Sequence, residues 1–366
     1  MNQQRALPRR SAVNDQRTFY IGIDLHKSFS TVTVLDETGG ELDQRNLAND
    51  EEDFTLYFRQ WEGQIRVALE ATFNWYWLVD LLQRLGADVK LANPYKTRII
   101  GEAKVKTDKI DSRILAQLLR ADFLPTSYIA SPRNRDEREW LRHRIYLVRL
   151  QTSIKMRIHC LIDKFNIRHS FTNLFCKNGM SFLKSLALPE HTQRSLQSLL
   201  DVYQAIHDEL NEIRNEIMAS AREDEDAKLL ESIPGIGYFS ALLLLKEMGT
   251  IERFSSPKRL VAYSGLAPGI SSSGGKTRTK GITKEGNKYI RWILIQAASS
   301  VVRHKKDQRL MRLYRRVQYR RNTKIAKVAV AKEILTFVYF ILKRREPYDP
   351  KRLFIQNTRR AILNGV

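Results

Sequence analysis

The pattern of apolar and polar positions over the first 130 residues is that of short strands alternating with amphipathic helices. Strands are predicted at four β-branched or apolar segments, namely Phe19–Lys27, Ser30–Gly39, Ile65–Thr72 and Ala87–Pro94. Helices are predicted at Asp50–Trp61, Trp75–Gly86 and Thr107–Asp122, the last with Thr107 as its N-cap. The first two strands close in a glycine turn and form a hairpin. This order predicts a mixed sheet with helices on its faces.

From about Asp136 the apolar residues recur three and four positions apart, which is the spacing of a coiled-coil seam. One segment carries Leu141, Ile145, Val148, Ile154, Ile158, Leu161 and Phe165. A second segment carries Leu199, Tyr203, Ile206, Leu210, Ile213 and Ile217. Both predict long helices, either an arm that dimerises or a helix pair packed within one subunit. We prefer the dimerising arm, from about residue 136 to 225.

The last block begins near Leu229 and predicts a mainly helical domain. A glycine turn at Pro234–Gly237 precedes an apolar helix and resembles the turn of a helix-hairpin-helix element, although a plain helix–helix turn has the same pattern. The stretch SSSGGKTRTKG, Ser271–Gly281, is expected to be a Ser/Gly/basic loop. The chain then divides into residues 1–18 (a disordered basic tail), 19–130 (α/β), 131–228 (helical), 229–345 (mainly helical) and 346–366 (a second tail).

Composition adds a large positive charge to this picture. The 366 residues include 62 Lys and Arg against 40 Asp and Glu, a formal net charge of +22. This excess indicates a polyanionic partner, most simply nucleic acid. An anionic membrane is the rival partner, but the longest apolar run, Ile334–Leu342, is half of the ~20 residues that a spanning helix needs. Residues 1–18 lack the apolar core of a signal peptide, and Cys160 and Cys176 lack metal-site spacing, so we expect a cytoplasmic protein with both cysteines in the core.

Four carboxylates stand out within the predicted α/β domain. Asp24 and Glu70 interrupt apolar strands, where a charge is costly unless it is paired or binds a metal. Asp108 and Asp111 lie three residues apart at the start of a helix and share one face. Hard oxygen ligands suit Mg²⁺, with Mn²⁺ as a substitute, and two metals ~4 Å apart would serve phosphoryl transfer. Taken singly, each acid fits a helix-dipole or salt-bridge role as well.

Basic residues and glycines supply candidate contacts to a nucleic-acid backbone. Eleven Lys and Arg but one Asp lie between Arg303 and Lys327, including Arg315, Arg316, Arg320 and Arg321. In the glycine turn, Gly235 and Gly237 would let backbone N–H groups approach a phosphate. Tyr314 and Tyr319 could stack on bases or pack inside the protein. His26 and Lys27, next to Asp24, are weaker candidates for a phosphate contact.

Several motifs in this order resemble the DEDD-type transposases of bacterial insertion sequences, whose relatives include site-specific DNA invertases. These motifs are IGIDLHK, ALEAT, KTDKIDSRILAQLL, IPGIGYFSALLLL and the segment from FSSPKRLVAYSGLAPG through SSSGGKTRTKG to GNKYIRWILIQAA. The resemblance extends from Phe19 to Leu342. It implies a RuvC-type, RNase H-class domain over residues 19–130 and a second transposase domain over 229–345.

The resemblance also implies a chemistry. The family's D-E-D-D acids correspond to Asp24, Glu70, Asp108 and Asp111, which would hold Mg²⁺. The nucleophilic serine, five residues after Pro268 and before a glycine, corresponds to Ser273, with Ser272 as the alternative because Ser271 and Ser272 precede it. The nearby Lys276, Arg278 and Lys280 would neutralise the charge that develops on phosphorus, and Lys284 and Lys288 are further candidates for nucleic-acid contacts.

Partners follow from the resemblance as well. Family members are guided by a structured bridge RNA that pairs with donor and target DNA. The acidic site and the serine are expected to complete the active site across subunits, in dimers that assemble into a tetramer, in the cytoplasm at the nucleoid.

The residues alone are also compatible with two other functions. A metal-dependent nuclease that hydrolyses DNA junctions would need the four acids and no serine. A non-enzymatic nucleic-acid-binding protein would need neither, although four intact acids argue against a decayed site.

Overall fold

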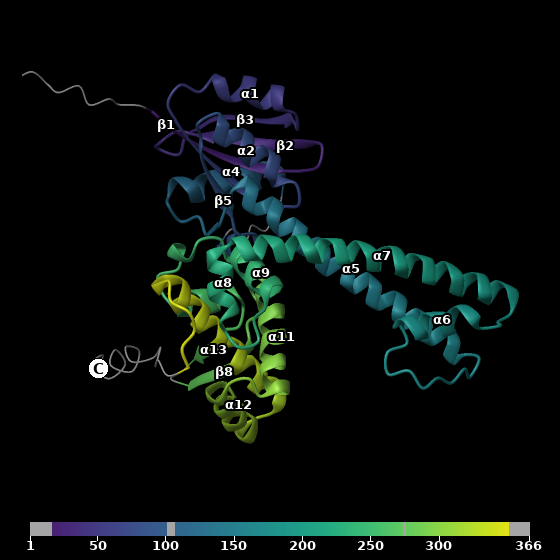
Figure 1. The fold of residues 1–366 in the computed structure, drawn as a ribbon. Coiled ribbons are helices and arrows are strands. Elements are labelled where there is room, and N and C mark those ends of the chain that lie inside the picture. Colours follow the sequence, from purple (N-terminus) through teal and green to yellow (C-terminus); the bar gives the residue numbers. More distant parts are fainter. Residues whose placement is uncertain (1–16, 101–106, 274–275, 351–366) are drawn as a thin grey trace, which may run out of the picture. The chain divides into compact units, whose positions relative to one another are not determined.

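The computed structural model describes residues 17–100, 107–273 and 276–350. It separates into two units, Met1–Pro132 and Arg133–Val366, each with its own hydrophobic core. Figure 1 traces both units in sequence colours. Within the described residues, every helix is too short or too polar to cross a membrane.

The first unit contains the mixed sheet that the sequence predicts. Its strands lie in the order β3-β2-β1-β4-β5-β6. The first three are antiparallel, β4 and β5 continue parallel to β1, and β6 is antiparallel to β5. The strands are β1 Thr18–Leu25, β2 Phe29–Leu35, β3 Glu41–Ala48, β4 Gln64–Glu70, β5 Asp88–Ala92 and β6 Thr126–Ser127.

Helices α1 Glu51–Arg59 and α2 Trp75–Arg84 cover one face of this sheet, and α4 Asp108–Arg120 covers the other. A short fourth helix, α3 Pro94–Ile100, follows β5. Apolar side chains of α1 and α2 pack with the odd-numbered residues of β1 and β4, such as Ile23 and Leu69. The even-numbered positions face α4, where Ala68 packs with Leu115. The Thr107 side chain accepts a hydrogen bond from the Ile110 amide, so the predicted N-cap of α4 is confirmed.

A glycine sets how closely α4 approaches the sheet. A Cβ atom on Gly22, in the middle of β1, would lie 1.9 Å from the Ser112 carbonyl oxygen of α4. Only glycine therefore lets the helix lie at this distance. A buried hydrogen bond of 2.7 Å between the Thr33 and Ser112 hydroxyls ties β2 to the same turn. The start of α4 is thereby held against the sheet.

The second unit is mainly helical. Its first helices are α5 Pro132–Asp163, α6 Lys177–Ser185, α7 Glu190–Glu223, α8 Glu225–Glu231 and α9 Tyr238–Met248. They are followed by η1 Ile251–Arg253, α10 Pro257–Tyr263, β7 Pro268–Ser273, β8 Lys276–Ile282, α11 Lys288–His304, α12 Gln308–Arg320 and α13 Thr323–Arg344. Buried residues of α9, α11 and α13 form its centre.

The long helices α5 and α7 run antiparallel as an arm, with α6 beside them (Figure 1). The Lys155 ammonium of α5 lies 5.5 Å from the ring centroid of Tyr203 on α7. Seam residues of both helices, among them Ile158, Ile206 and Ile213, are buried within one chain. These seam residues therefore pack within one chain, whereas Val148 and Phe165 of the same pattern are exposed, so dimerisation through the arm stays a prediction. The spacing alone does not distinguish packing within a chain from packing between chains, because both need the same apolar stripe.

The two cysteines also differ from expectation. Cys160 and Cys176 are both exposed, so they are not core residues. The Cys176 sulfur accepts a hydrogen bond from the Gly179 amide and caps α6. Cys176 therefore contributes to the helix terminus and not to the core.

Because Ile206 and Ile213 are buried within one chain, Ile206→Asp and Ile213→Asp together are expected to unfold the arm. A carboxylate buried without a partner costs about 3–5 kcal/mol. The melting temperature followed by circular dichroism should fall well below that of the wild type. Val202→Asp is the matched control, because Val202 lies on the same helix and is 47% exposed. A stable double variant whose mass by light scattering is halved would show that these residues hold two chains together.

Candidate functional site

The four predicted acids converge at one edge of the first unit. Asp24 is near the end of β1, and Glu70 is the last residue of β4. These strands are parallel neighbours, with Ile23 opposite Leu69, so the two carboxylates lie side by side. Both occupy even-numbered positions and face α4, because side chains alternate along a strand. The carboxyl ends of two adjacent strands therefore bring these acids together.

Asp108 and Asp111 reach the same place from the first turn of α4. Gly22 lies two positions before Asp24 on the same face, and its close contact with α4 places the start of the helix over the strand end. A cavity of about 300 Å³ results. Its lining consists of Asp24, His26, Glu70, Thr107, Asp108, Asp111 and Leu115.

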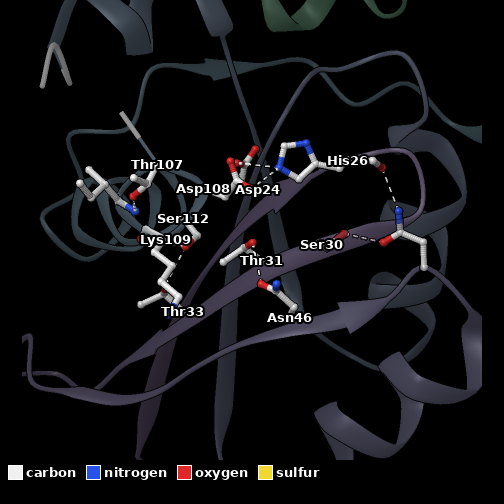
Figure 2. A network of polar contacts seen from close by, with 12 residues as sticks. Asp24, His26, Ser30, Thr31, Thr33, Asn46, Thr107, Asp108, Lys109 and Ser112 are labelled. Atoms are coloured by element: carbon white, nitrogen blue, oxygen red, sulfur yellow. Dashed lines mark hydrogen bonds and ion pairs between the residues drawn. The ribbon is translucent and has the colours of Figure 1, made fainter. Parts of the chain in front are cut away.

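His26 enters this cavity beside the acids (Figure 2). Its Nε2 atom lies 3.3 Å from Asp24 Oδ2 and 3.2 Å from Asp108 Oδ2. One ligand atom from each of these three residues can be chosen so that all lie within 4.8 Å of one another. The sequence pattern ranked His26 as a weak candidate, because a single histidine after a strand has no distinguishing spacing. The continued alternation Gly22, Asp24, His26 is the signal that could have placed it.

Polar contacts behind the cavity fix the first turn of α4 (Figure 2). The Gln44 amide donates both to the Thr33 hydroxyl, at 2.9 Å, and to the Lys109 carbonyl, at 3.1 Å. The Ser112 hydroxyl contacts the same carbonyl at 3.1 Å. Gln44 lies on strand β3, which no pattern in the sequence predicts. Its mostly exposed residues lack an apolar alternation, and pairing with β2 imposes the strand.

The donor set fits a divalent cation. Four carboxylates and one imidazole line a small cavity in a protein of net charge +22. Asp24 is mostly shielded, with 18% of its side chain exposed, whereas Asp108 is 49% exposed and open to a ligand from solvent. Carboxylate oxygens are ligands for Mg²⁺ and Mn²⁺, and an imidazole is a common further ligand for transition metals.

In the second unit, the segment expected to be a Ser/Gly/basic loop is a β-hairpin instead. Strands β7 and β8 are antiparallel, with Ser273 opposite Lys276 and Ser271 opposite Arg278. Threonines at alternate positions of β8 favour a strand. The high Ser and Gly content of the segment led instead to the prediction of a loop. The side chains of Ser272, Ser273, Lys276, Arg278 and Lys280 lie outside the described residues. The backbone nevertheless places Ser273 at the last position of β7.

The base of this hairpin is anchored to α11. The Arg291 guanidinium donates to the carbonyls of Ser264 and Lys284, at 3.2 and 3.1 Å. Asn287 caps α11, and its amide also donates to Glu247 Oε2 at 2.6 Å. Glu247 is fully buried and accepts two further bonds from Arg142, at 2.7 and 2.9 Å. A buried glutamate paired in this way resists movement, because freeing it would leave a charge uncompensated.

The turn between α8 and α9 requires a glycine for a structural reason, independent of any ligand. Gly235 has φ +91°, and a Cβ atom there would lie 2.7 Å from the Ala297 carbonyl oxygen of α11. Glycine is thus required for a left-handed turn in close contact with a helix. Gly237 is exposed and caps α9 with extended backbone. Of the two candidates, Gly237 is the one whose surroundings leave room for a ligand.

The basic run forms helix α12 with one buried and one exposed face. Leu310, Met311 and Tyr314 are buried, whereas Tyr319 is 94% exposed. The predicted contact residues Arg315, Arg316, Arg320 and Arg321 are all exposed, as are Lys284 and Lys288. A hollow of about 460 Å³ is lined by Arg309, Arg312, Leu313, Arg316 and Glu333. Tyr314 therefore packs inside the protein, whereas the exposed Tyr319 is free of the core and remains the candidate for stacking on a base.

Comparison with known proteins agrees with these features. Residues 21–167 match a transposase family defined by DEDD-type enzymes related to IS110, and residues 227–315 match the transposase IS116/IS110/IS902 family. The transposase for insertion sequence element IS1328 of Yersinia enterocolitica is 28% identical, over 76% of this chain and 82% of the relative. The transposase for IS1111A of Coxiella burnetii is 25% identical, over 90% of both. A pilin gene-inverting protein of Moraxella bovis is 22% identical, over 91% of this chain and 98% of the relative.

The two family matches fall on both units of the chain, one over the four acids and the other over the glycine turn and the hairpin. The relatives align over most of their own lengths. The chain belongs to the DEDD-type insertion-sequence transposases.

Proposed function

We propose that this protein is an RNA-guided transposase that cuts and rejoins DNA through a serine-linked intermediate, with a metal held by Asp24, Glu70, Asp108 and Asp111. Its family membership implies cleavage and rejoining of DNA in general terms. The observation that carries the proposal is the convergence of four acids from β1, β4 and α4 on one cavity.

In this proposal the four acids bind the divalent metal and fix its position. A divalent metal supplies, when bound, polarisation of a phosphoryl oxygen. Asp24 and Glu70 are held on strands, and Asp108 and Asp111 on a helix that Gly22 and the Gln44 contacts keep in place. Ligands on rigid elements keep their geometry as the substrate charge changes, which is the condition for electrostatic catalysis. The scissile phosphate would enter from the Asp108 side, which is the more exposed.

Ser273 is proposed as the nucleophile. Its oxygen would form a new bond to phosphorus while the bond from phosphorus to one sugar oxygen breaks, and the serine proton would end on that leaving oxygen. The phosphoserine ester conserves the phosphodiester bond energy, so a second sugar hydroxyl can later displace the serine. Lys276, Arg278 and Lys280 all lie on β8, where Lys276 pairs with Ser273 and Arg278 with Ser271. Their positive charges suit a phosphate. The anchored hairpin base supports a fixed position for this strand.

The proposed partners are donor and target DNA and a structured bridge RNA. The exposed arginines of α12 and the high net charge support backbone contacts. Structured RNA is read mainly by shape and backbone, which suits a surface of exposed arginines. Assembly of dimers into a tetramer stays part of the proposal.

The decisive experiment incubates the purified protein with element-end DNA, target DNA and RNA transcribed from the non-coding end of the element. Joined products that require the RNA, together with a covalent protein–DNA adduct, are expected. Cleavage without an adduct would support the alternative, a junction nuclease. Binding without cleavage would support a non-enzymatic binding protein. Full recombination after RNase treatment would reject RNA guidance alone.

The α12 surface gives a separate prediction. Arg312→Ala with Arg316→Ala is expected to weaken RNA and DNA binding at all sequences, because both residues would contact phosphates. Each lost phosphate contact lowers the slope of log affinity against log salt by about 0.7–0.9. Fluorescence anisotropy over a salt series measures this slope. Arg84→Ala is the matched control, since Arg84 is exposed but already paired with Glu51. An unchanged slope in the double variant would remove α12 from the binding surface.

A further inference from the structure

The position of His26 is held by contacts from three other parts of the first unit. Its carbonyl oxygen accepts hydrogen bonds from the Asn49 and Asn74 side-chain amides, both at 2.8 Å. Its backbone amide donates to the Phe29 carbonyl at 3.1 Å, and its ring packs against the Phe29 ring with centroids 4.8 Å apart. Asn49 follows β3 and Asn74 precedes α2, so residues distant in sequence position this one histidine. A histidine placed in this way is a built feature of the cavity.

The contacts of Nε2 differ from those of an ordinary histidine–carboxylate pair. The Asp24 and Asp108 oxygens lie 3.3 and 3.2 Å away, within ion-pair distance, but Nε2 makes a hydrogen bond to neither. The atom itself is shielded from solvent, although 38% of the side chain is exposed. This ring nitrogen lies between two carboxylates at ion-pair distance without a hydrogen bond to either, and the three ligand atoms are close enough to share one metal ion.

We propose that His26 binds the metal through Nε2, together with Asp24 and Asp108, and that it makes the site prefer Mn²⁺ to Mg²⁺. The inference rests on the proposed metal site, but on neither the serine nucleophile nor the guide RNA. An all-carboxylate set suits Mg²⁺, which prefers oxygen, whereas imidazole favours transition metals. Replacing one oxygen ligand by a ring nitrogen therefore shifts the relative affinity towards Mn²⁺.

Pulsed electron paramagnetic resonance of Mn²⁺ bound to the full-length protein tests this directly. A nitrogen ligand produces a hyperfine coupling to ¹⁴N, and labelling histidine with ¹⁵N changes that coupling. The wild type should show it, and His26→Gln should lose it. His191→Gln is the matched control, because His191 is exposed on α7 and should leave the coupling unchanged. Circular dichroism melting of each variant establishes that it is folded.

Metal affinities give the second readout. By calorimetric titration, His26→Gln should weaken Mn²⁺ binding by about 10-fold or more and Mg²⁺ binding much less, since ligand-shell changes cost about 10–100-fold. His26→Asp, which supplies an oxygen in place of the nitrogen, should recover binding with a preference moved towards Mg²⁺. A rescued affinity with reversed preference is not expected of a residue that only supports the fold.

The outcomes separate this inference from the proposed metal site. Mn²⁺ that binds the wild type, fails to bind Asp24→Asn and shows no ¹⁴N coupling would overturn the role of His26 alone. An equal loss of Mn²⁺ and Mg²⁺ affinity in a folded His26→Gln variant would overturn the selectivity. A wild type that binds neither metal would reject the site together with the inference.

Discussion

Ser273→Ala is expected to abolish strand exchange and to remove any covalent protein–DNA intermediate. Loss of the attacking hydroxyl leaves only binding and electrostatic contributions, so the rate should fall by on the order of 10⁵-fold or more. Neighbouring serines should not substitute, because a reacting atom misplaced by about 1 Å costs ~100-fold. Trapping the reaction on a suicide DNA substrate, followed by digestion and mass spectrometry, identifies the linked residue.

Ser271→Ala and Ser272→Ala are the controls for this result, because they make the same change in the same strand. Ser271 pairs with Arg278 in the hairpin, two positions from Ser273, and its loss should be mild. Binding of DNA and RNA by Ser273→Ala should match the wild type. An adduct on Ser272, an adduct on a tyrosine, or normal recombination without any adduct would each reject Ser273 as the nucleophile.

Asp24→Asn is expected to abolish recombination while nucleic-acid binding is retained. Asp24 is the most central acid, since it lies beside Glu70 in the sheet and lines the cavity with both acids of α4. A bound metal contributes several kcal/mol to phosphoryl transfer, and each 1.36 kcal/mol is a factor of ten in rate. The rate should therefore fall by about 10³-fold or more. Asp111→Asn should behave alike, and both are measured by recombination assays in Mg²⁺ and in Mn²⁺.

Asp122→Asn is the matched control for the acids. Asp122 lies in the same unit, is exposed and has φ 56°, a conformation that asparagine tolerates. Its replacement should change neither the rate nor metal affinity. Full activity of Asp24→Asn or Asp111→Asn with Mg²⁺ would contradict the metal-site assignment, whatever the fate of Ser273.

Local patterns predicted most of the elements of the first unit. Apolar β-branched runs identified β1, β2, β4 and β5, and capping at Thr107 identified the start of α4. These signals are readable because burial on one or both faces of a sheet requires a periodic apolar pattern. Strands β3 and β6 and helix α3 were not predicted, since their residues are mostly polar or exposed. The strand conformation of β3 depends on backbone pairing with β2, and α3 is a short helix that begins at Pro94.

The four acids could be named from the sequence because each breaks a pattern: Asp24 and Glu70 interrupt apolar strands, and Asp108 and Asp111 share a helix face. Whether the four carboxylates lie close together depends on the order of the strands and the position of the helix, which the sequence does not give. The parallel pairing of β1 with β4 and the contact of α4 at Gly22 brought them to one cavity. The alternation of Gly22, Asp24 and His26 is a local signal for the face of His26, whereas the contacts of Asn49 and Asn74 with its backbone carbonyl come from the tertiary structure.

Charge, periodicity and motif order were thus enough to predict a nucleic-acid partner, a mixed sheet with a helical arm, and the transposase family. Tertiary structure alone decided that the seam of Ile206 and Ile213 is satisfied within one chain, that Tyr314 is buried while Tyr319 is exposed, and that Ser273 ends a strand. The physical reason is common to all three. An apolar stripe, an aromatic ring or a serine has the same local pattern whichever surface covers it, and only the packed chain supplies that surface.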